Sequence, residues 1–401
     1  MAAQQNAKTP RALTGIVWPV AAYSIIYTLL FLIVNLMPIY TGVFIDVGGL
    51  TEVDAGWVNS AYLAAMTVAA IAFTVVLTRF PLRRLGFVAT AVMVVGLCIP
   101  LSVSEPGAVV VAMAITGIGN GALFAIVNAS AAMERHPVLV YGAGIVLSNL
   151  VTAAVPSPLY DAVDVWAVSG LFVPPLALIP LVLVSLLVLK RRSAPTDTAS
   201  GPARATMSGA YNGTAVAVLV AIFLANLLLM TYYAFADRLL VNAGSDSDAI
   251  ASVFTIVYFA AAICGVIAMA MARWPSSLVT GATAFTALLV VSILVATMSK
   301  TPWLVAIAIV VAGGVSMLNM SVQLGVAADI DPSGRVAAAA SGAQFAAWTL
   351  GPILGGWLIE GTGFGGIAVL VAVLGVLSVA LLILVDVRRR GRHTATAPGD
   401  C

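Results

Sequence analysis

Twelve apolar stretches, each about as long as a membrane-crossing helix, follow one another along this chain of 401 residues. They lie near residues 16–45, 56–78, 85–103, 107–131, 139–159, 166–189, 213–239, 249–272, 278–298, 302–328, 336–359 and 364–385. The hydrocarbon core of a bilayer is about 30 Å thick, and a helix needs about 20 residues to cross it. The pattern predicts an all-α integral membrane protein with twelve transmembrane helices.

Composition excludes a soluble domain. Hydrophobic residues make up 62% of the chain and charged residues 8%, and the mean hydropathy is +1.10. A soluble protein of this length needs far more charged surface, whereas a chain surrounded by lipid is apolar on its outside as well as in its core. The lipid bilayer is therefore the expected partner. The formal net charge of +2, with basic residues spread along the chain, gives no support for nucleic-acid binding.

The first apolar stretch begins near Gly15 and runs for about 30 residues, whereas the apolar core of a signal peptide has about 7–15. It also lacks a small-residue cleavage site, so we expect it to be retained as the first helix. The three cysteines, Cys98, Cys264 and Cys401, have neither metal-ligand spacing nor a paired framework. The sequence predicts no metal site and no cofactor.

The distribution of Lys and Arg predicts the orientation, because short cytoplasmic loops retain positive charge. With the N-terminus inside, the cytoplasmic segments hold Lys8, Arg11, Arg79, Arg83, Arg84, Arg135, Lys190, Arg191, Arg192, Arg204, Arg273, Arg335, Arg388, Arg389, Arg390 and Arg392. Only Arg238 and Lys300 fall on the other side. We therefore expect both termini to be cytoplasmic, and the short loops suggest a bacterial inner (plasma) membrane.

A polar segment divides the chain into two halves. Residues 190–212 are rich in Ser, Thr, Ala, Pro and Gly without apolar periodicity, which is typical of a linker. We predict an N-terminal six-helix bundle at 1–189, a cytoplasmic linker at 190–212, a C-terminal six-helix bundle at 213–387 and a basic cytoplasmic tail at 388–401.

The two halves also share residues at nearly constant offsets, which indicates an internal repeat. The matched pairs are Asn35 and Asn226, Phe44 and Phe235, Asp46 and Asp237, Asn128 and Gln323, Glu134 and Asp329, Pro137 and Pro332, and Pro156 and Pro352. We therefore predict two pseudo-symmetric bundles.

Four local motifs resemble those of the major facilitator superfamily. They are AGWVNSAYLAAMTVAAI (55–71), TRFPLRR (78–84), TGIGNGAL (116–123) and LGPILGGW (350–357). The match has departures, since Thr78 stands where the family usually has Asp, Pro81 where it usually has Gly, and Met113 where it usually has Arg. The resemblance extends from Trp18 to Leu384. It implies the fold of that family, with a substrate site near the bilayer midplane between two bundles that rock to expose it to each side in turn.

Polar and aromatic side chains within the apolar stretches are the candidates for substrate binding. They are Asn35, Tyr40, Asn120, Asn128, Asn226, Tyr232, Asn319, Gln323, Gln344 and Trp348. In lipid such groups face the protein interior or a wet cavity. The amides have a second interpretation, as hydrogen bonds that hold helices together. The aromatic residues near helix ends, including Tyr62, Tyr233 and Tyr258, have one as well, as an interface belt.

Charged candidates lie near the helix ends. Asp46 and Asp237 each follow a matched Asn by eleven residues, so they would face the same way on a regular helix and could carry protons during transport. We favour the alternative that both are hydrated end caps. Arg79, Arg83 and Arg84 could latch a cytoplasmic gate, although the positive-inside rule alone accounts for them.

The scarcity of charge within the helices favours a small neutral or lipophilic organic solute, with protons as a second partner. No GxxxxGK[ST] loop occurs, so any driving force is an ion or solute gradient. We predict a secondary active transporter, with proton-linked efflux as the favoured mode and a monomer as the functional unit. The alternatives are a facilitated-diffusion uptake permease and a non-transporting receptor or sensor on the same fold. An enzyme is not expected, because His136 and His393 have no catalytic partner in the sequence.

Overall fold

The computed structural model describes residues 10–103, 105–134, 137–189, 213–271, 278–331 and 335–395. Every regular element in these ranges is a helix. The predicted linker at 190–212 lies outside the described residues.

The N-terminal half consists of eight α-helices and three short 3-10 turns. The helices are α1 (Pro10–Asn35), α2 (Met37–Asp46), α3 (Glu52–Val76), α4 (Leu82–Cys98), α5 (Pro106–Ala132), α6 (Pro137–Thr152), α7 (Pro156–Trp166) and α8 (Val173–Ser185). The 3-10 turns are η1 (Ile99–Leu101), η2 (Ala167–Phe172) and η3 (Leu186–Val188).

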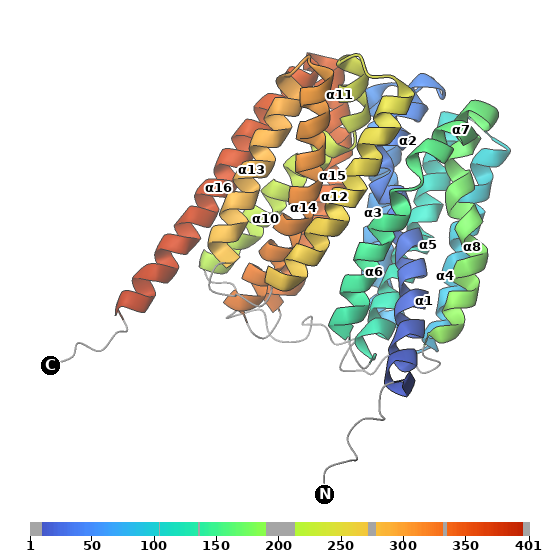
Figure 1. Cartoon of the computed structure of the whole chain (residues 1–401), viewed down its shortest axis with the longest axis horizontal. Helices are drawn as coiled ribbons and strands as arrows, with labels where there is room; N and C mark the ends of the chain where they lie inside the picture. The colour runs from blue at the N-terminus through green and yellow to red at the C-terminus, as the bar shows by residue number, and fades with distance from the viewer. Residues whose placement is uncertain are drawn as a thin grey trace, which may run out of the picture.

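The C-terminal half forms a second bundle beside the first (Figure 1). Its described helices are α10 (Gly213–Tyr233), α11 (Ala236–Asn242), α12 (Ser247–Met271), α13 (Leu278–Met298), α14 (Pro302–Ile330), α15 (Arg335–Thr362) and α16 (Phe364–Ala395). The first and last helices both run to the same end of the molecule, which we call the terminal end. The opposite end, where α2 and α11 lie, is called the distal end.

The all-helical membrane fold is confirmed. Ten segments among the described residues are long and apolar enough to cross a membrane. One of them, Pro156–Val188, combines α7, η2, α8 and η3, while α6 is a shorter apolar helix and α15 is not among the ten. The helix ranges accommodate twelve passes when α1 with α2, α6 with α7, and α10 with α11 are each counted as one.

One predicted boundary is wrong. The sequence pattern ends the fifth stretch near residue 159, but α7 begins at Pro156 and continues to Trp166. Proline is well tolerated in the first turn of a helix, so Pro156 starts α7 and does not end the fifth pass. The last apolar stretch, predicted to end near residue 385, agrees with the candidate span Phe364–Arg388, and α16 itself continues to Ala395.

Apolar side chains cover the outside of the bundle, as expected for a surface in lipid. Val68, Ile71, Val165, Ile263 and Val376 are each more than 60% exposed. Five tryptophans in the described ranges are at least half exposed: Trp18, Trp57, Trp166, Trp303 and Trp357. The belt interpretation is wrong for Tyr40, Tyr62, Tyr232 and Tyr258, because all four are fully buried.

Close helix packing explains the glycines of the TGIGNGAL motif. A side chain on Gly117 or Gly121 of α5 would overlap the backbone of α3 at Tyr62 or Met66. Glycine therefore lets these two helices approach within the N-terminal half, as the motif predicts. Between the halves, α3 packs on α15, and α12 packs on α6 and α7.

Buried hydrophobic residues form two clusters. The larger contains residues of both halves, from Tyr23 to Val371. The smaller belongs to the C-terminal half alone and uses the terminal-end turns of its helices, with Val218, Val326 and Leu382 among its members. The C-terminal half thus has a separate core at its terminal end.

Candidate functional site

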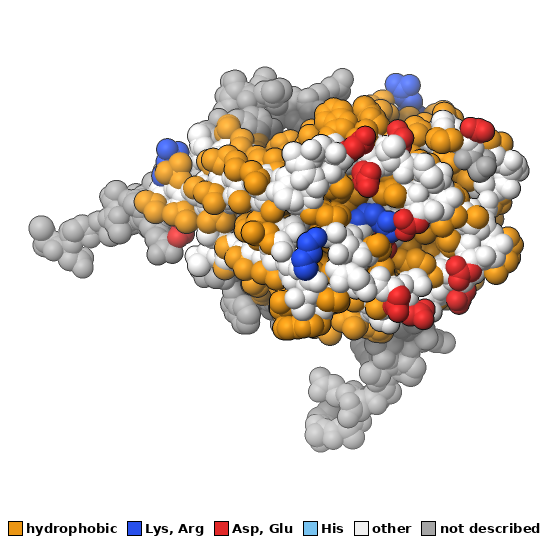
Figure 2. All heavy atoms as spheres, turned by 90° about the horizontal axis from the view of Figure 1, so that it is seen from above, with side chains coloured by type: hydrophobic (Ala, Val, Ile, Leu, Met, Phe, Trp, Pro, Cys, Tyr) orange, Lys and Arg blue, Asp and Glu red, His pale blue; other side chains and the backbone are white. Residues whose placement is uncertain are grey.

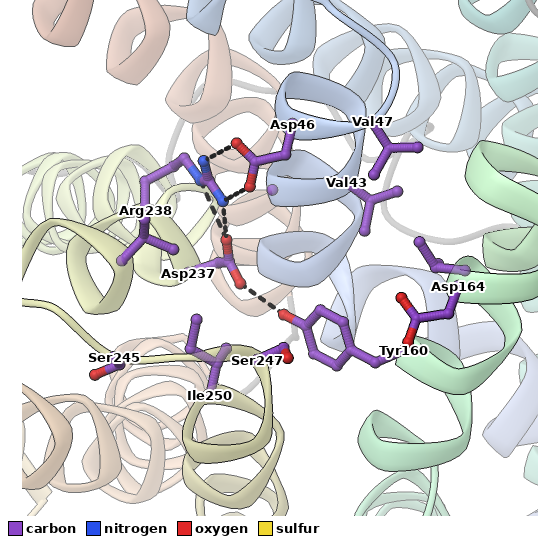
Figure 3. Close-up of a pocket in the computed structure, with 13 residues that line it drawn as sticks. Val43, Asp46, Val47, Tyr160, Asp164, Asp237, Arg238, Ser245, Ser247 and Ile250 are labelled. Carbon is purple, nitrogen blue, oxygen red and sulfur yellow. Dashed lines mark hydrogen bonds and ion pairs between the residues drawn. The ribbon is translucent and has the colours of Figure 1, made fainter.

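A charged cluster joins the two halves at the distal end. Arg238, on α11, donates two parallel hydrogen bonds to Asp46, the last residue of α2 (Figure 3). The Nη1 to Oδ1 distance is 2.6 Å and the Nη2 to Oδ2 distance is 2.5 Å. This bidentate geometry is the strongest arrangement for an arginine and a carboxylate. Arg238 therefore ties the C-terminal half to the N-terminal half.

Asp237 lies at the centre of the same cluster. Arg238 donates to its Oδ2 from Nε at 3.1 Å and from Nη2 at 2.8 Å. The hydroxyl of Tyr160, on α7 of the other half, donates to its Oδ1 at 2.8 Å. The Asp237 side chain is only 2% exposed, so the expectation of a hydrated end cap is wrong for this residue. Asp46 differs in burial, because its side chain is 55% exposed.

We call Asp46, Tyr160, Asp237 and Arg238 the distal clasp. A buried carboxylate is costly unless it is paired and hydrogen-bonded, and the clasp meets both conditions for Asp237. A side chain at Gly42 would overlap this carboxylate, so glycine on α2 permits the close approach of α11. A cavity of about 180 Å³ adjoins the clasp and is lined also by Asp164, Ser245 and Ser247. Seen from the distal end, the surface shows basic side chains among several acidic ones (Figure 2).

Below the clasp, a break in the first pass creates another contact between the halves. The helix is interrupted at Leu36, and Pro38, in the first turn of α2, has no N–H to donate to the Val34 carbonyl. The carbonyl oxygen of Asn35, the last residue of α1, accepts hydrogen bonds from the hydroxyls of Tyr233, at 2.5 Å, and Tyr258. Both tyrosines belong to the C-terminal half. Asn35 thus joins the two halves through its backbone carbonyl oxygen.

Within the described ranges, hydrogen bonds join the halves between the distal end and the middle of the helices. Besides those above, the backbone N–H of Ile353 donates to the hydroxyl of Ser60 at 3.2 Å. Towards the terminal end the halves touch through apolar groups, for example where Met269 lies against Gly142. This conformation is therefore closed by polar bonds at its distal end.

A second polar group lies near the middle of the C-terminal half. The indole N–H of Trp348 donates to the side-chain oxygen of Asn226 at 3.0 Å. The Asn226 amide in turn donates to Oε1 of Gln323 at 3.2 Å. Three helices, α10, α14 and α15, thus contribute one residue each. The structure brings these three predicted binding residues together.

An aromatic row connects this group with the other half. Trp348 contacts Phe345 at a ring-centroid distance of 5.5 Å, and Phe345 contacts Phe124 of α5 at 5.9 Å. Phe124 then contacts Phe31 of α1 at 6.0 Å. All four side chains are partly buried, so the row crosses the interface between the bundles.

Other predicted binding residues form hydrogen bonds inside one half. Asn120 donates to the carbonyl of Leu30 and to the Tyr62 hydroxyl, Asn128 accepts from Tyr27, and Asn319 accepts from Thr286. Tyr40 donates to the carbonyl of Leu171 at 2.5 Å. For these four side chains the observed bonds are those of helix packing. The buried Tyr232 hydroxyl and the Gln344 amide nitrogen have no partner among the described residues.

The arginines proposed as a gate lie where α3 is connected to α4, at the terminal end. Arg79 and Arg84 are exposed and Arg83 is partly buried. No ion pair among the described residues includes any of the three. The described part of the chain also contains no group of three metal-ligating side chains.

Sequence reasoning missed Arg238 and Tyr160. Arg238 did carry a signal, because it is one of two basic residues that depart from the positive-inside pattern, and it directly follows Asp237. Tyr160 carried none, since its importance depends on how the fifth pass meets the seventh.

The molecule is thus a helical membrane protein of two bundles that meet along polar and apolar contacts. The model of the Major Facilitator Superfamily matches residues 20–351, and this chain belongs to that family. No curated protein matches the sequence. Among solved structures, a mutant of the nucleoside transporter NupG gives a TM-score of 0.67 at 14% identity, covering 92% of this chain and 99% of NupG. The human organic anion transporter MFSD10 (TETRAN) gives 0.63 at 14% identity, covering 91% and 98%. These likenesses support the fold.

Proposed function

We propose that this chain is a secondary active transporter that exports a small neutral or lipophilic organic solute by alternating access, driven by protons. The carrying observation is the distal clasp, because it joins the halves at one end and contains a buried carboxylate that a proton would neutralise. Its bonds can be exchanged for bonds to water when the halves move, as an alternating closure requires.

The orientation follows from charge. Apart from Arg238 and Lys300, the described basic residues lie at the terminal end. The distal end instead carries many acidic residues, among them Asp46, Glu52, Asp54, Asp161, Asp164, Asp246 and Asp248. By the positive-inside rule the terminal end is cytoplasmic, and the membrane is the plasma membrane of the cell. The clasp then faces outward, and the present conformation is closed to the outside.

Protons would act on the clasp from that side. A proton on Asp46 or Asp237 removes a negative charge that Arg238 binds, which weakens the tie between α2 and α11. Proton entry would then accompany opening to the outside and release of the solute. As the carboxylate pairs with Arg238 again and the distal end closes, its proton would leave towards the cytoplasmic end, because only a proton that crosses the membrane can drive export.

A neutral solute is favoured over an organic anion. The two solved neighbours carry nucleosides and organic anions according to their names. Anion binding would want an unpaired cation near the interface, but Arg238 already binds two carboxylates. Asn226, Gln323, Gln344 and Trp348 supply uncharged polar groups beside the aromatic row. We assign the central solute site to these residues, with the monomer as the working unit.

The test is proton movement in liposomes that contain the purified protein and a pH-sensitive dye. Neutral metabolites and lipophilic drugs are added with and without an imposed pH gradient. We expect at least one compound to drive proton flux that the double variant Asp46→Asn with Asp237→Asn loses. Flux that survives in the double variant would assign protons to another route. Solute uptake without proton flux would favour the facilitated-diffusion permease, and no movement of any solute would favour a receptor or sensor.

A further inference from the structure

The hydrogen-bonded chain of Trp348, Asn226 and Gln323, near the middle of the C-terminal half, has a fixed donor-to-acceptor direction. An indole N–H can only donate, so the atom of Asn226 that faces Trp348 must be its oxygen. The nitrogen of Asn226 therefore points the other way, where it donates to the Ile222 carbonyl at 2.8 Å and to Gln323. Gln323 must present its oxygen to Asn226. Its nitrogen is consequently turned away from the chain.

That nitrogen has no acceptor among the described residues. Nε2 of Gln323 is buried without a hydrogen-bond partner, and the residue is only 1% exposed. Rotating the amide by 180° would not help, because two N–H groups would then face each other at Asn226. Buried amide groups nearly always have partners, so an unpaired one calls for an explanation.

A second orphan atom of the same kind lies on α15. Nε2 of Gln344 is also buried with no partner in the described part of the chain, and Gln344 is 5% exposed. It precedes Trp348 by one helical turn, so both side chains lie on the same face of α15. Both unpaired nitrogens are donors.

We infer that the solute of this carrier must supply a hydrogen-bond acceptor, such as a carbonyl oxygen or an aromatic ring nitrogen, to Gln323, whose donor is aimed by Trp348 through Asn226. This inference rests on the proposed function and adds the substrate class. The adjoining row of Phe345 and Trp348 favours a planar solute that stacks on aromatic faces. Because Gln323 is buried in this conformation, the solute would reach it when the bundles move apart.

Binding to the purified protein in detergent tests this inference with matched probes. One pair is N-methyl-2-quinolone and 1-methylnaphthalene, and the other is pyridine-3-methanol and benzyl alcohol. The first member of each pair carries an acceptor that the second lacks. Tryptophan fluorescence and the thermal unfolding midpoint report binding. We expect the acceptor-bearing member to bind about tenfold more tightly, the effect of one good hydrogen bond.

Three variants separate the steps. Gln323→Met removes the donor at nearly constant length and should abolish the preference. Trp348→Phe keeps the aromatic ring but frees Asn226 and Gln323 to turn together, so the preference should fall while stacking binding persists. Asn149→Leu removes a buried amide of α6 that donates to its own helix, and it should leave the preference unchanged.

The outcomes are distinct from those of the proton assay. Equal binding within each pair, or a preference that survives Gln323→Met, would overturn the inference even where the liposomes show transport. Failure of every probe to bind the wild type would overturn it as well. If transport is lost in the double variant Asp46→Asn with Asp237→Asn but is unchanged in Gln323→Met, the proposed function is supported and the inference about Gln323 is overturned.

Discussion

The two ends of the interface between the bundles are held differently. At the distal end, Arg238 binds Asp46 of the N-terminal half, and Tyr160 binds Asp237 of the C-terminal half. Two tyrosines of the C-terminal half also donate to the backbone carbonyl of Asn35. At the terminal end, the described residues show apolar contacts between halves, and the C-terminal half has a core of its own there. Among the described residues, directional bonds between the halves are found at the distal end.

This difference bears on how the molecule moves. Breaking a polar bond that becomes exposed to water costs little free energy, because water replaces the lost partner. While such a bond is formed, however, it holds its two residues in a defined geometry. An interface held in this way has two discrete states, closed and open, without a continuous series of intermediates. The distal end has the properties of a gate, and the predictions below test how much of its closure depends on each part of the clasp.

The largest effect is expected for Arg238→Met. Asp237 would remain buried without a counter-charge, and breaking a buried pair in this way costs about 3–5 kcal/mol. The distal end should open. The reporter is Ser60→Cys, at a buried position of α3 that contacts α15. Its thiol should react much faster with a membrane-impermeant reagent in Arg238→Met than in the parent protein. The background for this measurement has Cys98, Cys264 and Cys401 replaced by serine.

Lys300→Met is the matched control for that experiment. Lys300 is also a cation at the distal end, but its contact, to Asn242 at 3.3 Å, is exposed. We expect the cysteine at position 60 to react as slowly as in the parent. Equal acceleration in both variants would mean that net charge at the distal end, and not the clasp, keeps the interface closed.

The second effect in size is expected for Gly42→Ala. The added methyl group would overlap the carboxylate of Asp237, which Arg238 and Tyr160 hold in place. Overpacking of this kind costs about 1–3 kcal/mol, and here the simplest relief is separation of α2 from α11. Thiol labelling at position 60 should accelerate, but less than in Arg238→Met. Gly107→Ala is the control, since nothing lies within 4 Å of the position of its added carbon.

The fold was predictable from the sequence because lipid imposes it locally. Length and hydropathy identify a membrane helix without any knowledge of its neighbours, and the positive-inside rule sets the direction of the whole chain. The glycines of α5 are likewise identified correctly as packing positions. The fifth pass is predicted too short because proline and acidic residues near Pro156 resemble a loop, although they continue this pass to Trp166.

The candidate site was predictable only in part. The repeat identifies the matched pair Asp46 and Asp237, but their equal spacing from Asn35 and Asn226 assumes regular helices. The first pass breaks at Leu36, whereas the seventh breaks near Ala234, so the two acids end in different environments. The partners across the interface depend on how the bundles meet, and no local pattern encodes that.

The smallest effect is expected for Asp46→Asn, the change that sharpens the comparison between the two acids. Asp46 binds Arg238 in bidentate fashion, yet its side chain is 55% exposed, and exposed ion pairs contribute about 0–1 kcal/mol. Asp237 continues to balance Arg238 in this variant, and the amide oxygen of the substituted side chain can still accept one hydrogen bond from the guanidinium. Labelling at position 60 should therefore increase only slightly, well below the rate in Arg238→Met. A rate as high as that of Arg238→Met would show that the exposed carboxylate closes the distal end, and the buried pair would then be an anchor for Arg238 within its own half.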